Sequence, residues 1–180
     1  MIEVKNLVKE FEDKQVLKGI STVFKSATTN LIIGKSGAGK TVLLKSLIGL
    51  VTRTSGEILF DGEDLVKAPL ERMRELRGRK IGMIFQDPMT SLNPTIKVGK
   101  QIMEGILIHK KVTREEAKQK AVEMLRKVGI PKPEERFHQY PHEFSGGMRQ
   151  RAVIAIALSC EPDLLICDEP TTALDVTIQA

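Results

Sequence analysis

Apolar and polar residues follow two different patterns along this chain of 180 residues, and the change falls near residue 88. Before it, short apolar runs are separated by turn residues, as in strands. After it, apolar residues recur every three or four positions, which is typical of amphipathic helices. The pattern predicts an α/β core interrupted by a mostly helical insert.

The first part of the chain predicts strands joined by turns. They lie at 2–4, 19–24, 30–33, 55–62 including its turn, and 81–85. The run that leads into Gly34 reads Asn-Leu-Ile-Ile, which favours a buried parallel strand. A helix is predicted directly after the following glycine-rich loop, over 41–49, with Gly49 at its end.

The second part predicts helices at 98–109 and 113–128. Thr113 and Glu116 have the spacing of a capping box, and Gly129 follows as a stop signal. Ser145 is the expected N-cap of a helix that runs to Leu158, and a buried strand is predicted at 164–167. These elements predict a core formed by 1–87 and 145–180 and a helical subdomain at 88–144.

The last residues, 177–180, resemble the first turn of a helix without any stop signal. We therefore expect the chain to be a fragment or a sequence assembled from pieces.

The formal net charge of +5 is compatible with binding to nucleic acid or to an anionic membrane. Basic residues are interleaved with acids, as in 114–118, which indicates a solvated face. With no Trp and only Tyr140, platforms for base stacking are scarce, so we expect no nucleic-acid partner.

No apolar run approaches the ~20 residues that cross a bilayer, and the first residues lack the pattern of a secretory signal. We therefore expect a cytoplasmic protein that reaches the membrane only through a partner. Cys160 and Cys167 form no C-x-x-C pair, and we expect buried or partly buried thiols.

Residues 34–41 match the phosphate-loop pattern G-x-x-x-x-G-K-[ST] without deviation. The glycines let backbone N–H groups turn toward phosphate oxygens, and the next helix adds its positive end. Lys40 supplies a charge for the β- and γ-phosphates, and the Thr41 hydroxyl is a ligand for Mg²⁺. The predicted nucleotide-binding residues of this loop are Gly34, Lys35, Ser36, Gly37, Ala38, Gly39, Lys40 and Thr41.

Two further segments complete the predicted site. Asp168 and Glu169 end the apolar run 164–167, at the sheet edge where α/β folds bind ligands. Asp168 is then a water-bridged partner of Mg²⁺, and Glu169 orients or deprotonates the attacking water. Ser145, Gly146 and Gly147 place a hydroxyl and open amides at a helix start. By itself this pattern is a common structural turn, but in a chain with a phosphate loop it predicts a second anion site for a nucleotide held by another copy.

Together with Gln86 and the run 173–175, these motifs resemble the ATPase subunit of ABC transporters over essentially the whole chain. The resemblance implies a P-loop NTPase core with an N-terminal antiparallel β-subdomain, a helical insert, and C-terminal strands that are missing from this chain. It also implies ATP and Mg²⁺ held between two head-to-tail subunits in a homo- or heterodimer, with membrane permease subunits as partners, at the inner face of the cell membrane.

By the same resemblance, Phe11 corresponds to the aromatic that stacks on adenine, and Gln86 to the sensor of Mg²⁺ and the attacking water. Glu169 corresponds to the catalytic base and Asp175 to the loop residue that crosses between subunits. For Phe11, a buried core aromatic is the alternative. The predicted catalytic residues are Lys40, Gln86 and Glu169, and the predicted metal ligands are Thr41, Gln86 and Asp168.

The chain departs from the family pattern in two places. Phe144 and Met148 replace the usual Leu and Gln around Ser-Gly-Gly, which leaves the backbone amides intact. The family's switch histidine follows the paired acids by some thirty residues, and His109, His138 and His142 all lie before them. A nucleotide-binding module without hydrolysis is therefore an open alternative.

The segments 85–94, 140–144 and 168–175 are similar to dipeptide, oligopeptide and nickel importer ATPases. The first sixty residues look more like ATPases of phospholipid transport, with a seam somewhere between 62 and 78. We weight the peptide importer more heavily, because the helical insert usually carries the membrane-subunit contact. A single cassette without heptads argues against the superfamily's DNA-repair and translation ATPases, and no Asn-Lys-x-Asp motif indicates a GTPase.

Overall fold

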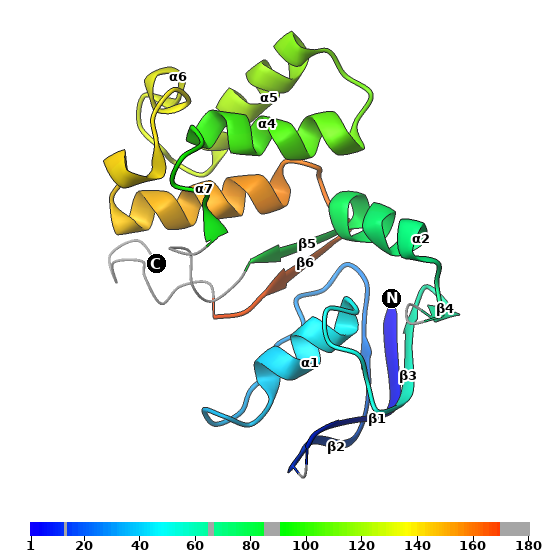
Figure 1. Ribbon diagram of the computed structural model, residues 1–180. Coiled ribbons are helices and arrows are strands. Elements are labelled where there is room, and N and C mark those ends of the chain that lie inside the picture. Colours follow the sequence, from blue (N-terminus) through cyan, green and yellow to red (C-terminus); the bar gives the residue numbers. More distant parts are fainter. Residues whose placement is uncertain (13, 65–66, 85–90, 170–180) are drawn as a thin grey trace. The chain divides into compact units, whose positions relative to one another are not determined.

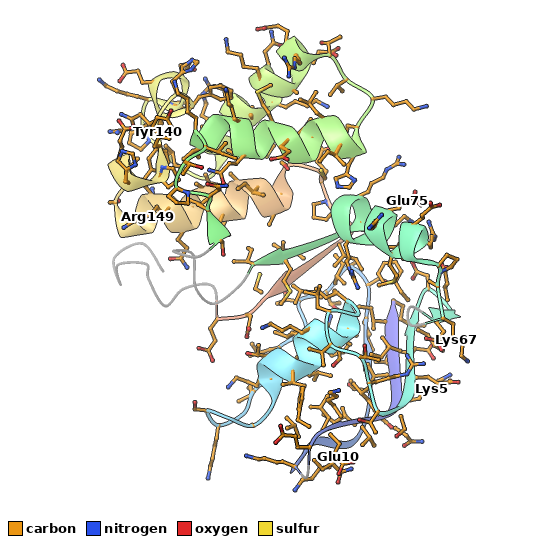
Figure 2. All side chains as sticks on the ribbon, viewed as in Figure 1. Lys5, Glu10, Lys67, Glu75, Tyr140 and Arg149 are labelled. Atoms are coloured by element: carbon orange, nitrogen blue, oxygen red, sulfur yellow. The ribbon has the colours of Figure 1, made fainter. Side chains whose placement is uncertain are left out.

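A computed structural model describes residues 1–12, 14–64, 67–84 and 91–169, and the chain divides into two compact units, 1–74 and 75–180 (Figure 1). Charged side chains such as those of Lys5, Glu10 and Lys67 lie on the surface of the first unit (Figure 2). Within the described ranges, no helix combines the length and the apolar content that a membrane span requires.

The first unit contains an antiparallel sheet with the strand order β2-β1-β3-β4. These strands are β1 Ile2–Phe11, β2 Lys14–Phe24, β3 Ser55–Phe60 and β4 Glu63–Asp64. The predicted antiparallel subdomain is thereby confirmed, but β1 and β2 are longer than predicted. The second half of β1 was missed because of an irregularity between Val4 and Leu7, where Asn6 has a φ of 48° and the alternation of apolar residues is broken.

One face of this sheet supplies the core of the first unit, with Val4, Leu7, Leu17 and Ile58 buried. Helix α1 (Lys40–Leu47) lies against β2 and buries Leu43, Leu44 and Leu47. It ends within two residues of the predicted end, followed by Gly49 with a φ of 67°. The first unit thus fixes the phosphate loop, at the start of α1, against a sheet strand.

The predicted buried strand at 30–33 is wrong in this structure. None of these residues is in a strand, and Leu31 and Ile33 are 79% and 85% exposed. An apolar run becomes a buried strand only when a neighbouring strand pairs with it and another layer covers it. Among the described residues, neither of the two sheets includes this run.

The second unit is built around three helices, α4 (Val98–His109), α5 (Arg114–Lys127) and α7 (Gly146–Leu158). Residues spaced four apart in α4, and again in α5, are fully buried where these helices pack together. They are Val98, Ile102 and Ile106 of α4 and Ala117, Ala121 and Leu125 of α5. The predicted bounds of these helices are confirmed to within one residue at each end.

The connection between α5 and α7 caps the N-terminal end of α4. Helix α6 (Pro133–Arg136) and the 3-10 turn η2 (Pro141–Glu143) lie between α5 and α7. The carbonyl oxygens of Phe137 and Gln139 accept hydrogen bonds from Gly99 and Val98, at 3.1 and 2.9 Å. Backbone from this connection therefore satisfies two N–H groups that the first turn of α4 cannot satisfy itself.

Strands β5 (Ile81–Ile84) and β6 (Leu164–Cys167) pair in parallel, with Ile81 opposite Leu164 and Ile84 opposite Cys167. Helix α7 lies along this pair (Figure 1). The strand at 164–167 is confirmed, but its burial on both faces is wrong. Ile166 is buried, whereas Leu165 is 38% exposed and Cys167 is exposed, so only one face of β6 is covered.

Five short elements were not predicted from the sequence. They are β4, α6, η2, and the helix α2 (Leu70–Glu75) with the π-helical turn η1 (Leu76–Lys80) that follows it. The segment 70–80 is dominated by Arg, Glu and Lys, so it carries little apolar periodicity. Phe85, Gln86 and the predicted helical turn at 177–180 lie outside the described residues.

Candidate functional site

The backbone of the phosphate loop makes a tight turn before α1. The Ala38 N–H donates to the Lys35 carbonyl oxygen at 3.1 Å. Gly37 and Gly39 have φ angles of 75° and 91°, a region that favours glycine. These two positions explain why the motif requires glycine there, because other residues would be strained.

The two glycines also differ in their surroundings. A Cβ atom on Gly39 would lie 3.0 Å from Cγ1 of Val16, so the helix start is packed closely against β2. A Cβ atom on Gly37 would meet no atom within 4 Å. Space next to the loop backbone is therefore open at Gly37.

Lys40 begins α1, and its side chain returns to the loop. Its Nζ donates to the carbonyl oxygens of Gly34 and Lys35, at 2.9 and 3.2 Å. The ammonium group therefore sits within the turn of the loop. Together with the first N–H groups of α1, it gives the loop the kind of positive charge that binds phosphate.

Phe11 ends β1 and is 44% exposed, which contradicts a role as a buried core aromatic. The Nζ of Lys9 lies 4.5 Å from the centre of its ring. Phe11 pairs with Lys14 in the β1–β2 hairpin, and Val16, two residues further, contacts Gly39. The ring and the start of α1 thus border the same end of strand β2.

Asp168 and Glu169 follow β6 as predicted. The Asp168 N–H donates to the Ile84 carbonyl oxygen at 2.9 Å, which extends the parallel pairing by one residue. Asp168 is 4% exposed, whereas Glu169 is exposed and has a φ of 51°. The chain turns sharply here, so the first carboxylate stays inside the unit and the second reaches the surface.

The start of α7, at Ser145, Gly146 and Gly147, has open space around its backbone, and we call it the α7 cradle. The Ser145 hydroxyl accepts a hydrogen bond from the Met148 N–H at 3.2 Å, which confirms Ser145 as the N-cap. Cβ atoms on Gly146 or Gly147 would meet nothing within 4 Å. The second unit itself therefore gives no steric reason for glycine at either position, and the missing side chains leave room for something outside it.

One polar side chain of the same helix has no role in the predicted site. Gln150 in α7 is 2% exposed, and within the described ranges its Oε1 atom has no hydrogen-bond partner. Such buried orphan acceptors are rare, since each costs about 1–3 kcal/mol. No sequence signal separates this glutamine from an ordinary polar residue on a helix surface.

The remaining predicted site residues are not brought together by the structure. Gln86 and Asp175 lie outside the described residues, and Thr41 and Asp168 belong to different compact units. Among the described residues, no three His, Cys, Asp or Glu side chains gather as a metal site.

Comparisons with known proteins agree with this arrangement of motifs. A family model described as "ABC transporter" matches residues 17–172. Oligopeptide transport ATP-binding protein OppD of Bacillus subtilis (strain 168) is 53% identical over all of this chain and 53% of its own length. Dipeptide transport ATP-binding protein DppD of the same organism is 54% identical over 92% of this chain and 51% of its own length. The chain thus spans about half the length of the curated relatives it matches.

Solved structures show the same fold. The ATP-binding cassette MJ0796, in a dimeric post-hydrolysis state bound to ADP and Pi, matches 98% of this chain and 77% of its own. The TM-score is 0.88 at 27% sequence identity. Another dimeric structure of MJ0796, a bacterial ABC transporter cassette, matches with a TM-score of 0.89 at 27% identity, over 99% of this chain and 78% of its own. With the phosphate loop, the acid pair and the α7 cradle in place, the chain belongs to the ABC transporter family.

Proposed function

We propose that this chain is the ATP-binding and ATP-hydrolysing motor domain of a peptide importer. The observation that carries the proposal is the phosphate loop, in which the Lys40 ammonium group lies at the loop backbone and the space beside Gly37 is open, at the start of α1. The residues present fit a triphosphate, because amides, a helix start and an ammonium group converge there.

Each described site residue has a role in this proposal. Lys40 binds the β- and γ-phosphates, Thr41 holds Mg²⁺ through its hydroxyl, and Asp168 orients the water shell around the metal. Bound Mg²⁺ supplies positive charge that offsets the charge of the phosphate oxygens. Glu169, exposed at the end of β6, accepts a proton from the attacking water. Gln86 is proposed to orient that water.

The open cradle of α7 supports a composite site between two copies. Gly146 and Gly147 leave free space above the helix start, which no described part of the second unit fills. A phosphate group held by a second subunit would accept hydrogen bonds from the N–H groups at this helix start. The solved relatives are described as dimers, which agrees with this arrangement. We propose that Asp175 crosses between the two subunits and that Phe11 stacks on adenine.

The transported class is inferred from the relatives. Proteins named for oligopeptide and peptide transport match the chain from its first residues to its last, including the first sixty. We therefore favour peptide import over phospholipid transport. Membrane permease subunits are the proposed partners, which places the protein at the inner face of the cell membrane. The 88–144 insert is the proposed contact region.

The deciding experiment separates binding from turnover in the full-length protein. Glu169→Gln should bind ATP as the wild type does but release phosphate about a hundredfold more slowly or worse. The reason is that a general base typically raises the reaction rate by about 10²–10⁴-fold. Glu123→Gln, a change on the exposed face of α5, is the matched control and should retain both activities. Normal turnover by Glu169→Gln would remove Glu169 as the base, and no ATP binding by the wild type would overturn the whole proposal.

A further inference from the structure

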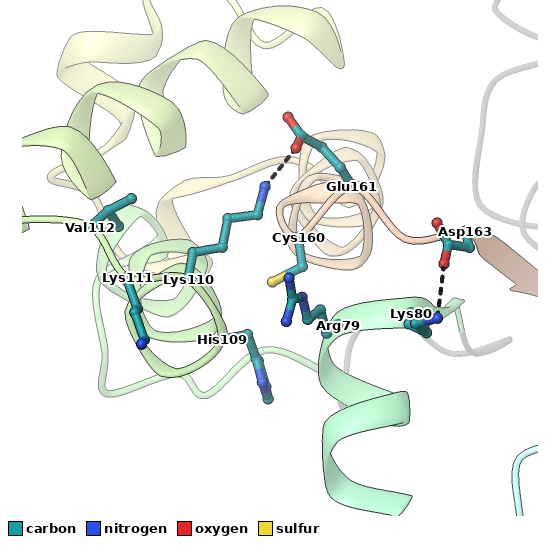
Figure 3. A pocket seen from close by; sticks show the side chains of 9 residues that line it. All are labelled: Arg79, Lys80, His109, Lys110, Lys111, Val112, Cys160, Glu161 and Asp163. Carbon is teal, nitrogen blue, oxygen red and sulfur yellow. Dashed lines mark hydrogen bonds and ion pairs between the residues drawn. The ribbon is translucent and has the colours of Figure 1, made fainter. Parts of the chain in front are cut away.

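A second hollow in the structure lies away from the candidate ATP residues, entirely within the second unit. It has a volume of about 890 Å³ and is bordered by η1, by the end of α4, and by the connection from α7 to β6 (Figure 3). Pockets for small molecules typically measure ~300–1,000 Å³. The hollow therefore has the size of a small-molecule site.

Its lining carries more positive than negative charge. Two lysines are neutralised: Lys110 lies 2.6 Å from Glu161, and Lys80 lies 3.9 Å from Asp163. Arg79 and Lys111 also line the hollow, and the described part of the chain provides no ion pair for either. Both acids of the pocket are already engaged, so two cationic groups remain to attract an anion.

The wall that carries Arg79 is an unusual local structure. Arg79 and Lys80 belong to η1, a π-helical turn, and such turns are rare and frequent at functional sites. Gly78 in the same turn faces the end of α4, where a Cβ atom would come within 1.9 Å of Nε2 of His109. The imidazole therefore lies directly on the backbone of the turn, and only glycine permits this contact. His109 is thereby held in the wall of the hollow.

The hollow is distinct from the candidate ATP residues of this unit. Cys160, which lines it, follows the C-terminal end of α7, whereas Gly146 begins that helix. Thirteen residues of α-helix separate them by ~20 Å. Asp163 precedes β6 and Asp168 follows it, so the hollow lies at the opposite end of this strand, ~13 Å away.

We propose that this pocket binds a small phosphorylated molecule through Arg79, Lys111 and His109. An arginine presents a planar fork of donors that matches phosphate oxygens, and a lysine adds a mobile charge. An imidazole ring provides a further hydrogen-bond donor. The hollow shape favours a compact ligand over a polymer, which would need a charged track along the surface.

The test uses the full-length protein and the NMR signals of its histidine rings. The signals of His138 and His142, each identified by its loss in the corresponding Gln variant, serve as internal references. We expect pyrophosphate to shift the His109 signals saturably, with inorganic phosphate weaker, and to leave His138 and His142 in place. The His109 signal is identified by its loss in His109→Gln.

Variants then test the proposed ligands. The double variant Arg79→Gln/Lys111→Gln should weaken the pyrophosphate binding that the His109 signal reports by about tenfold or more, because it removes both unpaired cations. Lys118→Gln/Lys120→Gln, a pair of equal charge on α5 outside the pocket, should bind as the wild type does.

The outcomes separate the proposal from its alternatives. Shifts that do not saturate, or equal shifts of all three histidines, would overturn it, as would unchanged binding by the pocket variant. Tighter binding of citrate or of an acidic peptide than of pyrophosphate would also overturn it, because the ligand class would then be carboxylate. Because the His109 signal reports on this pocket alone, these outcomes do not depend on whether the protein hydrolyses ATP.

Discussion

The Nζ atom of Lys40 lies 2.9 Å from the carbonyl oxygen of Gly34, so the cation of the phosphate loop is held by the loop that it serves. A second bond to the carbonyl oxygen of Lys35, at 3.2 Å, fixes the ammonium group between these two residues. Little reorganisation of the side chain is needed before phosphate oxygens can reach it, and such preorganisation favours binding.

The first prediction concerns Lys40→Ala. It should reduce ATP affinity by about tenfold or more, because charge-assisted bonds to phosphate contribute about 1.5–3 kcal/mol. Its effect on stability should be small, since the carbonyl oxygens of Gly34 and Lys35 lie in exposed residues that water can reach. Calorimetric titration of the full-length protein measures the affinity, and thermal unfolding measures the stability.

Lys45→Ala is the control, since Lys45 carries the same charge in the last turn of the same helix. It should leave ATP affinity unchanged. Equal losses in the two variants would mean that overall charge, and not the place of Lys40 in the loop, determines affinity.

The second prediction separates folding from assembly at the start of α7. Gly146→Ala creates no contact within 4 Å in this unit, and alanine favours helices over glycine by up to ~1 kcal/mol. The variant should therefore be as stable as the wild type or more stable. It should nevertheless lose ATP-dependent dimerisation, because the added methyl group fills the space proposed for a phosphate.

Light scattering in the presence of ATP, in a Glu169→Gln background that preserves the bound nucleotide, measures the assembly. Dimerisation at wild-type strength would argue against the composite site. Loss of stability would show instead that Gly146 has a structural role.

The third prediction compares two glycines of α4. A Cβ atom on Gly99 would lie 2.2 Å from the buried ring of Phe137, whereas on Gly105 its nearest neighbour would be the Ser159 hydroxyl at 3.6 Å. Gly99→Ala should therefore destabilise the protein by about 1–3 kcal/mol, the usual cost of overpacking. Gly105→Ala should stabilise it by up to ~1 kcal/mol. Urea unfolding of both variants tests the sign, and the same sign for both would contradict the packing described at Phe137.

The fourth prediction concerns acid and the capping box of α5. The pKa of Glu116 is lowered, first by the hydrogen bond from the Thr113 backbone N–H and then by the Thr113 hydroxyl. A carboxyl group whose pKa falls on folding stabilises the protein above its unfolded pKa, and this contribution is lost as pH falls through the folded pKa. The cap should therefore weaken below the ordinary value of 4.5.

The comparison variant is Glu116→Gln, whose amide oxygen can accept from Thr113 at every pH. The wild type should be the more stable of the two near neutral pH, and the difference should shrink as the solution is acidified. Thermal unfolding of both proteins across this range provides the measurement. A difference that does not change with pH would mean that the charge of Glu116 does not contribute.

The long helices α5 and α7 of the second unit could be predicted because their signals are local. Thr113, Glu116 and Gly129 mark the ends of α5 by side-chain and backbone chemistry within a few residues. Ser145 does the same for α7. Such signals need no knowledge of distant contacts, so they were confirmed within one residue.

Strand pairing depends on distant partners, and there the sequence was less informative. The run 30–33 has the composition of a buried strand, but no described strand pairs with it. In β1 the irregularity near Asn6 interrupts the alternation, which hid the second half of the strand. The π-helical turn at Leu76–Lys80 has no recognised sequence signal.

Much of the candidate site was predictable, because phosphate binding needs a fixed spacing of particular residues. The loop at 34–41 precedes α1, the acids at 168–169 follow β6, and Ser145 is the N-cap of α7, whereas the strand predicted before the loop is not formed. The unpaired amide oxygen of Gln150 and the basic pocket beside His109 could not be found this way. Both arise from residues brought together by folding.

The exposure of Leu31 and Ile33 affects how the protein behaves at high concentration. These two large apolar side chains are spaced two apart, and the backbone of their run is not paired in either described sheet. Another chain can therefore pair with this run as an added strand. The purified 180-residue chain should therefore be prone to self-association and poor solubility.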